Sequence, residues 1–185
     1  YKGNFWISGN GDDDTQVLKF TSSGTFLLQI GTHGVHNGSN DTANLWKPTE
    51  GSVDEATDEV YVSDGYGNKR VIAFDSETGQ YKRHWGAYGN RPDDTDLGTY
   101  DPNAPPAQQF RNPVHCAEIS NDDLVYVCDR QNDRIQVFHT DGSFMREEFI
   151  AKQTRGPGSV WDIAFSRDPQ QTYIYLADGG NHNIH

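Results

Sequence analysis

Two short stretches of this chain carry the same pattern, and the residues at which they differ are of types that can do chemistry. The stretch VYVSDGYGNKRVIAFD at 60–75 returns as VYVCDRQNDRIQVFH at 125–139, with DGYGNKR exchanged for DRQNDR. Positions that differ between copies are candidates for function, because the shared positions serve the fold. Tyr66 and Arg130 are therefore candidates: a phenol can transfer a proton, and a guanidinium fork suits a carboxylate.

His115 is a third candidate. It lies in FRNPVHC, just upstream of the second copy, whereas the first copy has LWKPTE at that place. We expect His115 at the start of an inner strand near the mouth of a channel, where an imidazole can bind a metal or make a hydrogen bond. Simpler roles stay open for the other two residues: Tyr66 caps its turn, or Arg130 pairs with Asp129 or Asp133.

The elements that must position these residues form a repeat. Four apolar runs end at equivalent places: FWIS before Gly9, VYVS before Asp64, VYVC before Asp129 and IYLA before Asp178. In the complete copies, one strand precedes this run and two follow it. Four short antiparallel strands per repeat are the content of a β-propeller blade. We expect the recurring Asp, Asn and Arg residues to tie each turn to the next strand.

The repeat predicts an all-β fold, a β-propeller of four-stranded antiparallel blades. About four blades are expected, as repeat units 1–31, 46–88, 109–150 and 158–185 of a single incomplete domain at 1–185. An unclosed ring leaves an apolar blade face in water. We therefore expect the chain to be a fragment of a ring of about six blades, closed by further blades or by a protein partner. Its entry directly on a strand and its stop at His185 favour truncation.

The composition agrees with strands and turns. The chain of 185 residues has 19 Gly, 9 Tyr, 9 Phe and 4 Trp but one Met, whereas helical domains favour Leu, Ala, Met, Glu and Lys. The formal charge of -12 argues against a nucleic-acid partner, because binding to phosphates needs clustered Lys and Arg. No apolar run approaches the ~18 residues of a membrane span, and the termini say nothing about export.

The other polar residues have plainer expectations. Cys116 and Cys128 fall in neighbouring strands and could pair, but we expect two buried free thiols. The aspartates at 12–14 and 93–101 lack the spacing of a calcium loop, so we expect solvated loops with at most loose calcium binding. The remaining histidines lack ligand spacing and are expected in solvent: His33, His36, His84, His139, His182 and His185.

The pattern VYVSDxxxNxRI resembles the NHL repeat over nearly the whole chain. The order KPT, VYVSDGY, a long loop, FxxPxH and VxDRxNxRIQ is similar to the lyase domain of peptide-amidating enzymes, peptidylglycine amidoglycolate lyase. The resemblance implies a six-bladed propeller whose central channel binds a peptidyl hydroxyglycine. That enzyme class is a carbon-nitrogen lyase, which splits this substrate into a peptide amide and glyoxylate.

The resemblance also implies roles for single residues. The family holds a zinc ion with three histidines from separate blades and carries a structural calcium ion. His115 would be one zinc ligand, Tyr66 the catalytic tyrosine and Arg130 an arginine beside the substrate. The cation would polarise the substrate hydroxyl while a phenolate takes its proton. The other two histidines would lie on a blade before residue 1 and on a blade after residue 185, and catalytic zinc needs three protein ligands.

The chain departs from the family where the family has two disulfides. Trp46 and Gly67 stand at the positions of one pair, and Tyr126 and Val137 at those of the other. Loss of both members of each pair suggests a divergent relative, and we expect a bacterial one located outside the cell or in the periplasm. Two functions stay open: a zinc-dependent lyase-like enzyme, or a non-catalytic propeller that binds a protein, peptide or glycan on its loop-rich face.

Overall fold

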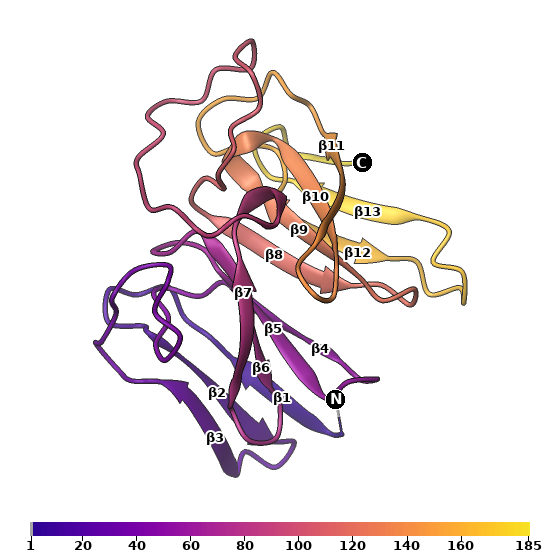
Figure 1. The fold of residues 1–185 in the computed structure, drawn as a ribbon. Coiled ribbons are helices and arrows are strands. Elements are labelled where there is room, and N and C mark those ends of the chain that lie inside the picture. Colours follow the sequence, from indigo (N-terminus) through magenta and orange to yellow (C-terminus); the bar gives the residue numbers. More distant parts are fainter. Residues whose placement is uncertain (1) are drawn as a thin grey trace.

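The computed structural model describes residues 2–185, which form four antiparallel β-sheets in sequence order (Figure 1). The first sheet contains β1 (Asn4–Ile7), β2 (Gln16–Thr21) and β3 (Phe26–Gly31). The second contains β4 (Glu50–Asp54), β5 (Glu59–Asp64), β6 (Arg70–Asp75) and β7 (Tyr81–Trp85). The third contains β8 (Val114–Ile119), β9 (Leu124–Asp129), β10 (Arg134–His139) and β11 (Phe144–Phe149). The fourth contains β12 (Asp162–Phe165), β13 (Ile174–Asp178) and β14 (Asn183–Ile184).

The expected all-β, antiparallel architecture is confirmed, and the two middle sheets have the expected four strands. The first sheet has three strands, because β1, with FWI, is the counterpart of β5. Two short 3-10 helices, η1 (Ala87–Gly89) and η2 (Arg130–Asn132), complete the secondary structure. The first residue of the expected unit 1–31 lies outside the described residues.

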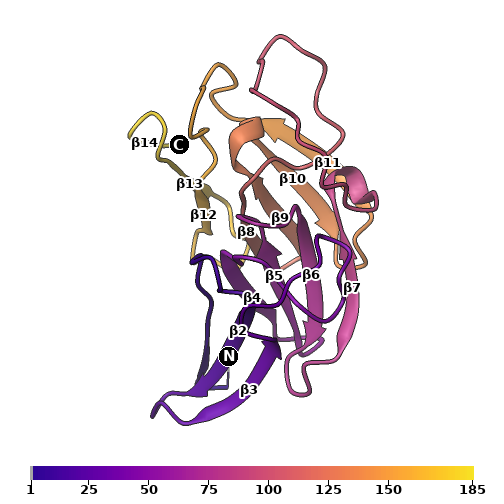
Figure 2. The ribbon, with the colours of Figure 1, turned by 90° about the vertical axis from the view of Figure 1, so that its left-hand side faces the viewer.

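The sheets follow one another in an arc that does not close over residues 2–185 (Figures 1 and 2). We call β4, β8 and β12 the inner strands, because each is the first strand of its sheet and they lie side by side. The start of each inner strand is therefore close to the start of the next, although these strands are far apart in sequence.

Apolar clusters between neighbouring sheets hold the arc together. Along β5, Val60 and Val62 pack with Val17 of the first sheet, whereas Tyr61 packs with Phe138 of the third sheet. Successive side chains of a strand point to opposite faces, so one strand can serve two interfaces. All five residues are at most 2% exposed, so these contacts remove apolar surface from water.

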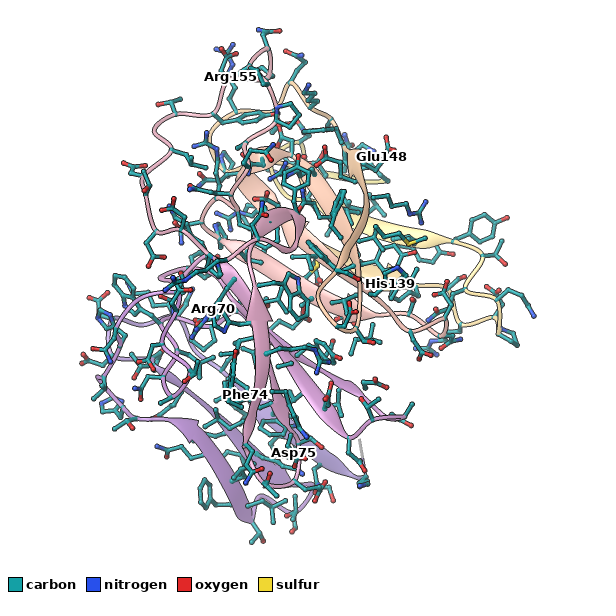
Figure 3. The ribbon with its side chains drawn as sticks, in the orientation of Figure 1. Arg70, Phe74, Asp75, His139, Glu148 and Arg155 are labelled. Carbon is teal, nitrogen blue, oxygen red and sulfur yellow. A yellow bond between two sulfur atoms is a disulfide. The ribbon has the colours of Figure 1, made fainter. Side chains whose placement is uncertain are left out.

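A buried aspartate ties the second sheet to the loop before it. Asp64 accepts hydrogen bonds from the backbone N–H of Trp46 at 2.8 Å, from Asn68 at 2.7 Å and from Arg70 at 2.9 Å. The Asp64 and Arg70 side chains are fully buried. A buried charge is costly unless it is paired and hydrogen-bonded, and here it is both. In Figure 3, Arg70 lies within the packed sheets, whereas Arg155 is at the molecular surface.

The third sheet repeats this clamp. Asp129 accepts from the backbone N–H of Arg111 at 3.0 Å, from Asn132 at 2.7 Å and from Arg134 at 2.8 Å. The expected role of the recurring Asp, Asn and Arg residues is thus confirmed for the two middle sheets. In the fourth sheet Asp178 bonds Asn181 and His185 instead of an arginine.

The expectation of two free thiols is wrong. Cys116 of β8 and Cys128 of β9 form a disulfide, with their Cα atoms 4.8 Å apart. Neighbouring antiparallel strands bring Cα atoms within the range that a disulfide spans. The sequence shows that both cysteines lie in adjacent strands, but the pairing register decides whether the two sulfurs meet.

Five of the six histidines and most of the loop aspartates are exposed, as expected, and His84 is half-buried, but some of these side chains make fixed contacts. His84 and His185 hydrogen-bond Tyr81 at 2.8 Å and Asp178 at 2.9 Å. In the stretch 93–101, Asp94 accepts hydrogen bonds from the amide and the hydroxyl of a serine in another loop. Carboxylates in these stretches therefore fix loop conformation.

Candidate functional site

The structure brings the three sequence candidates into contact. Tyr66 Oη lies 3.3 Å from Nε2 of His115, and Nη1 of Arg130 donates a hydrogen bond to Tyr66 Oη at 3.1 Å. The Tyr66 and His115 rings meet edge to face, with centroids 5.8 Å apart. Residues from the second and third sheets thus form one cluster, which we call the Tyr–His–Arg cluster.

Tyr66 is held by the turn that follows β5. The Asn112 side chain donates to the carbonyls of Gly65 at 2.8 Å, Tyr66 at 3.3 Å and Asn68 at 2.8 Å. A Cβ atom on Gly65 would lie 1.9 Å from the Val114 carbonyl oxygen. Only glycine allows the turn to approach β8 this closely, so the sequence around Tyr66 fits its position next to the strand that carries His115.

His115 sits on a β-bulge. Val114 pairs with Asp129 and Ala117 pairs with Val127, so two residues of β8 face one residue of β9. A bulge of this kind changes the direction of the side chains on the bulged strand. It explains why His115 reaches across to the second sheet.

The His115 imidazole has a defined proton arrangement. Nε2 faces Tyr66, and the ring donates a hydrogen bond to the Trp161 backbone. Because Nε2 is engaged with Tyr66, the donor to Trp161 is Nδ1. Burial and the nearby Arg130 charge lower the pKa of His115, so the ring is neutral at neutral pH. A neutral imidazole with Nδ1 protonated offers its Nε2 lone pair to a proton or a metal.

Arg130 is a buried cation that has no carboxylate partner among residues 2–185. It is 8% exposed, and its Nε makes no hydrogen bond. The expected neighbours are otherwise engaged, because Asp129 pairs with Arg134 and Asp133 bonds Ser159. The structural alternative, in which Arg130 pairs with Asp129 or Asp133, is therefore wrong.

Trp161, which no sequence pattern marked as a candidate, completes the cluster. The Arg130 guanidinium lies over the Trp161 ring at 4.6 Å and over the Tyr66 ring at 5.5 Å. The Trp161 and His115 rings are 5.8 Å apart. Counting back from the serines at 120 and 166 places Trp161 opposite His115 in the aligned inner strands, and that alignment is the signal that could have found it.

A group of acids lies on the same inner strands. Oxygen atoms of Glu50 and Asp162 and the sulfur of Cys116 lie within 4.8 Å of one another. Burial and the charges of Glu118 and Asp162 raise the pKa of Glu50 to about 8, and Glu50 hydrogen-bonds Glu118. The Cys116 sulfur belongs to a disulfide, so this group offers two carboxylates and no thiolate.

The donor set around His115 does not make a zinc site by itself. Among residues 2–185, no group of three metal-ligating side chains includes His115. A catalytic zinc ion takes three protein ligands, and His115 offers one nitrogen.

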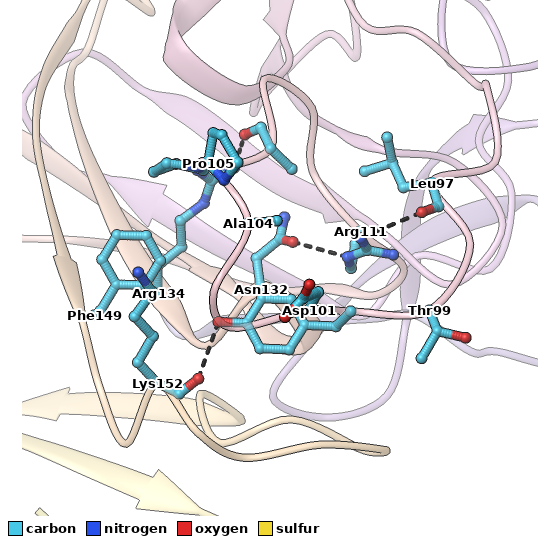
Figure 4. A pocket seen from close by; sticks show the side chains of 13 residues that line it. Leu97, Thr99, Asp101, Ala104, Pro105, Arg111, Asn132, Arg134, Phe149 and Lys152 are labelled. Atoms are coloured by element: carbon cyan, nitrogen blue, oxygen red, sulfur yellow. Dashed lines mark hydrogen bonds between the residues drawn. The ribbon is translucent and has the colours of Figure 1, made fainter.

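A separate cavity of about 170 Å³ lies under the loop at 97–107 and contains none of the cluster residues (Figure 4). Its arginines already hold the loop: Arg111 donates to the Gly98 carbonyl, and Arg134 donates to the Ala107 carbonyl at 2.8 Å. The Tyr100 hydroxyl donates to the backbone of Lys152 at 3.1 Å. The cavity is therefore a fixed feature of the loop, and its guanidinium groups are not free for an anion.

No helix within residues 2–185 has the length and apolar character that a membrane span requires. No family model matches the chain. The chain is 32% identical over 146 residues, 78% of its length, to the peptidylglycine alpha-amidating monooxygenase of Rattus norvegicus. It spans 14% of the length of that relative.

Solved structures show the same type of fold. BamB from Moraxella catarrhalis, a propeller, superposes with a TM-score of 0.52 at 13% identity, over 100% of this chain and 40% of BamB. A putative exported protein from Bacteroides fragilis superposes with a TM-score of 0.50 at 14% identity, over 90% of this chain and 40% of that protein. Together with the antiparallel four-stranded sheets, the structural similarities support a propeller-type fold. The sequence similarity supports a family of propellers that is similar to the peptidylglycine alpha-amidating monooxygenases.

Proposed function

We propose that this chain is part of an NHL-type propeller that splits peptides ending in α-hydroxyglycine into a peptide amide and glyoxylate. Tyr66, His115 and Arg130 form its site in the central channel. The observation that carries the proposal is their mutual contact, at 3.3 Å between Tyr66 and His115 and 3.1 Å between Arg130 and Tyr66. These are the same three residues that the resemblance to the lyase domain implied.

Arg130 is proposed to bind the substrate carboxylate. Its guanidinium is buried between two aromatic rings, and no carboxylate of the described chain pairs with it. Arginine presents donors in a fixed fork that matches the geometry of a carboxylate. A bound α-hydroxyglycine would thus neutralise the buried charge and bring its hydroxyl toward Tyr66.

Tyr66 and His115 are proposed to move the proton. The substrate hydroxyl loses its proton to Tyr66 Oη as Tyr66 gives its own proton to Nε2 of His115. The oxygen electrons then form the carbonyl of glyoxylate while the C–N bond breaks. The departing amide nitrogen keeps the electron pair of that bond and takes the proton that His115 received, so the protons balance and the reaction needs no oxidant or reductant.

The proposals of a zinc ion and a calcium ion rest on the resemblance and not on contacts in the structure. The resemblance implies both, but the donor set of this chain gives one nitrogen at His115, which does not fit a three-ligand zinc site. No step above therefore uses a metal. We propose zinc binding at His115 only for a form of the protein in which further ligands reach Nε2. A structural calcium ion has no assigned residues in this chain.

Glyoxylate release from a peptide that ends in α-hydroxyglycine tests the reaction. Tyr66→Phe is expected to lower kcat by about 100-fold or more, because it removes the proton-transfer oxygen. Arg130→Gln is expected mainly to raise KM, because the substrate carboxylate loses its cation. Tyr175→Phe, at an exposed tyrosine outside the cluster, is the matched control and should keep wild-type rates.

Metal content gives a second, independent measurement. If zinc binds, His115→Ala should remove a stoichiometric metal, whereas Tyr66→Phe should keep the metal and lose turnover. Full activity of both variants would refute the assignment of the site.

The alternative is a non-catalytic propeller that binds a protein, peptide or glycan. The cavity under the loop at 97–107 favours it, because a hollow of about 170 Å³ lined by fixed loop residues can hold one small group of a larger ligand. On this alternative, Tyr100→Ala should weaken ligand binding, and Tyr66→Phe or His115→Ala should leave it unchanged. Calorimetric titration with a peptide that ends in α-hydroxyglycine separates the two functions, because the lyase proposal makes Arg130→Gln the damaging change.

We also infer the setting in which the chain works. Four sheets are proposed to belong to a ring of about six blades, closed by further blades or by a protein partner, and a bacterial source is part of this proposal. The denatured mass of the protein from its source tests it, because further blades require a mass well above 20.7 kDa. A location outside the cell or in the periplasm is supported by the disulfide and by similarity to a putative exported protein.

A further inference from the structure

We propose that the Cys116–Cys128 disulfide is a positioning element for the Tyr–His–Arg cluster. It fixes the bulge that directs His115 toward Tyr66 and keeps β8 and β9 in one relative position. Its expected effect on turnover rests on the proposed function, whereas its effect on the geometry of the cluster does not.

The first observation is that the bulge is specific to one inner strand. The ladders between β4 and β5 and between β12 and β13 run without a register shift. In β8, by contrast, the ladder skips from Val114 to Ala117, so His115 and Cys116 together face Cys128. A bulge leaves its extra residue unpaired and disrupts the ladder locally. His115 therefore sits where ladder hydrogen bonds are weakest.

The second observation is that the disulfide lies at this same point. Cys116 directly follows His115, and Cys128 is two residues before Arg130. One covalent bond therefore joins the backbone that carries His115 to the backbone that carries Arg130. Both cysteines are fully buried in the apolar cluster between the third and fourth sheets, so packing holds the bridge in place.

The third observation concerns a position at which a different disulfide would not touch the bulge in β8. Tyr126 and Val137, which stand at a disulfide position of the resembling family, face each other directly across β9 and β10. A bridge there would also cross-link the third sheet, but on the side of β9 away from β8. This pair offers a control that separates general stabilisation from local positioning.

The experiment compares three forms of the chain. The first is the wild type, and the second is Cys116→Ala/Cys128→Ala. The third adds Tyr126→Cys/Val137→Cys to the second, and its melting temperature is measured to establish how much stability the new bridge restores. Backbone amide exchange over residues 114–117 and the ring ¹⁵N shifts of His115 report the geometry, and glyoxylate release reports turnover.

The expected result is local. Amide protection at 114–117 should fall about 10-fold or more in both variants, while β5 and β6 stay protected. The His115 ring should change from one tautomer to an average of two, and kcat should fall at least 10-fold where turnover is present. Restoration of protection and of the single tautomer by the bridge at 126 and 137 would overturn the proposal, because the native bridge would then act through stability alone.

Unchanged protection and an unchanged His115 tautomer in the double alanine variant would also overturn it. If the geometry changes as expected but no form releases glyoxylate, the proposed function fails and the positioning role stands. Exchange is compared at a temperature at which all three forms are folded by far-UV circular dichroism, so global unfolding is not read as a local effect.

Discussion

The second and third sheets share one clamp but differ at their inner edges. In both sheets a buried aspartate at the end of the second strand bonds an asparagine, an arginine and a backbone N–H. The β4–β5 ladder is regular, whereas the β8–β9 ladder carries a bulge and a disulfide. The shared parts satisfy buried polar groups, and the candidate site occupies the parts that differ.

Arginines show the same contrast. Arg70 and Arg134 are fully buried and paired with aspartates. Arg130 is nearly as buried, but it contacts two aromatic rings and a phenol instead of a carboxylate. The two buried arginines that have acid partners serve the fold, and Arg130, the buried arginine without an acid partner in the described chain, is the candidate for binding a ligand.

The clamps are expected to show the largest effect on stability. Arg70→Leu and Arg134→Leu should each lower the free energy of unfolding by about 3–5 kcal/mol, because each leaves a buried carboxylate unpaired. Arg130→Leu should cost about 1 kcal/mol, because it leaves no carboxylate behind. Urea denaturation measures all three. An equal loss of stability for Arg130→Leu would mean that this arginine also serves the fold and does not differ from Arg70 and Arg134.

Loss of the disulfide should have the second-largest effect on stability. Cys116→Ala/Cys128→Ala should lower the free energy of unfolding by about 2–4 kcal/mol, because the unfolded chain gains the freedom of the loop that the bridge closes. Thermal denaturation of the variant, beside the reduced wild type, is the measurement. Equal stability of this variant and the oxidised wild type would leave the bridge without an energetic role.

Gly65→Ala tests the contact between the Tyr66 turn and β8. The added Cβ would meet the Val114 carbonyl at 1.9 Å, so the turn must move, and overpacking of this kind costs about 1–3 kcal/mol. Gly51→Ala on β4 is the matched control, because its Cβ would find only ordinary contacts, the nearest at 3.6 Å. Equal denaturation midpoints for the two variants would show that the turn is not tightly packed against β8.

The acids on the inner strands predict a pH effect. The pKa of Glu50 is raised from 4.5 to about 8, so between these values the folded chain binds more protons than the unfolded chain. The free energy of unfolding should therefore fall as pH rises from about 4.5 to about 8. Glu50→Gln should remove this dependence, and Glu55→Gln, at an exposed position, should keep it. A pH profile that Glu50→Gln leaves unchanged would assign the effect to other groups.

Much of the fold could be predicted from the sequence. The runs before Asp64, Asp129 and Asp178 indicated strands, and the strand count of the two middle sheets followed from the repeat. Such patterns are local, because strand alternation and turn residues act over a few neighbours. The clamp partners could also be predicted, since Asp, Asn and Arg recur at nearly fixed offsets.

The site could be predicted in part. Tyr66, His115 and Arg130 differ between the copies, and the structure brings these candidates together. Trp161 and the disulfide were missed for a physical reason. Trp161 reaches the cluster through the packing of one sheet on the next, and the sulfurs meet because the register of β8 and β9 places Cys116 opposite Cys128.

The strands, the clamps and the identity of the candidate residues follow from short-range patterns, which occur more than once in the repeat. The contact of a tyrosine with a histidine 49 residues away and an arginine 64 residues away arises only when the sheets pack together. The burial of this arginine without an acid partner also arises only from that packing. Those outcomes depend on the angle between sheets and on one extra residue in a ladder, which are properties of contacts between distant segments.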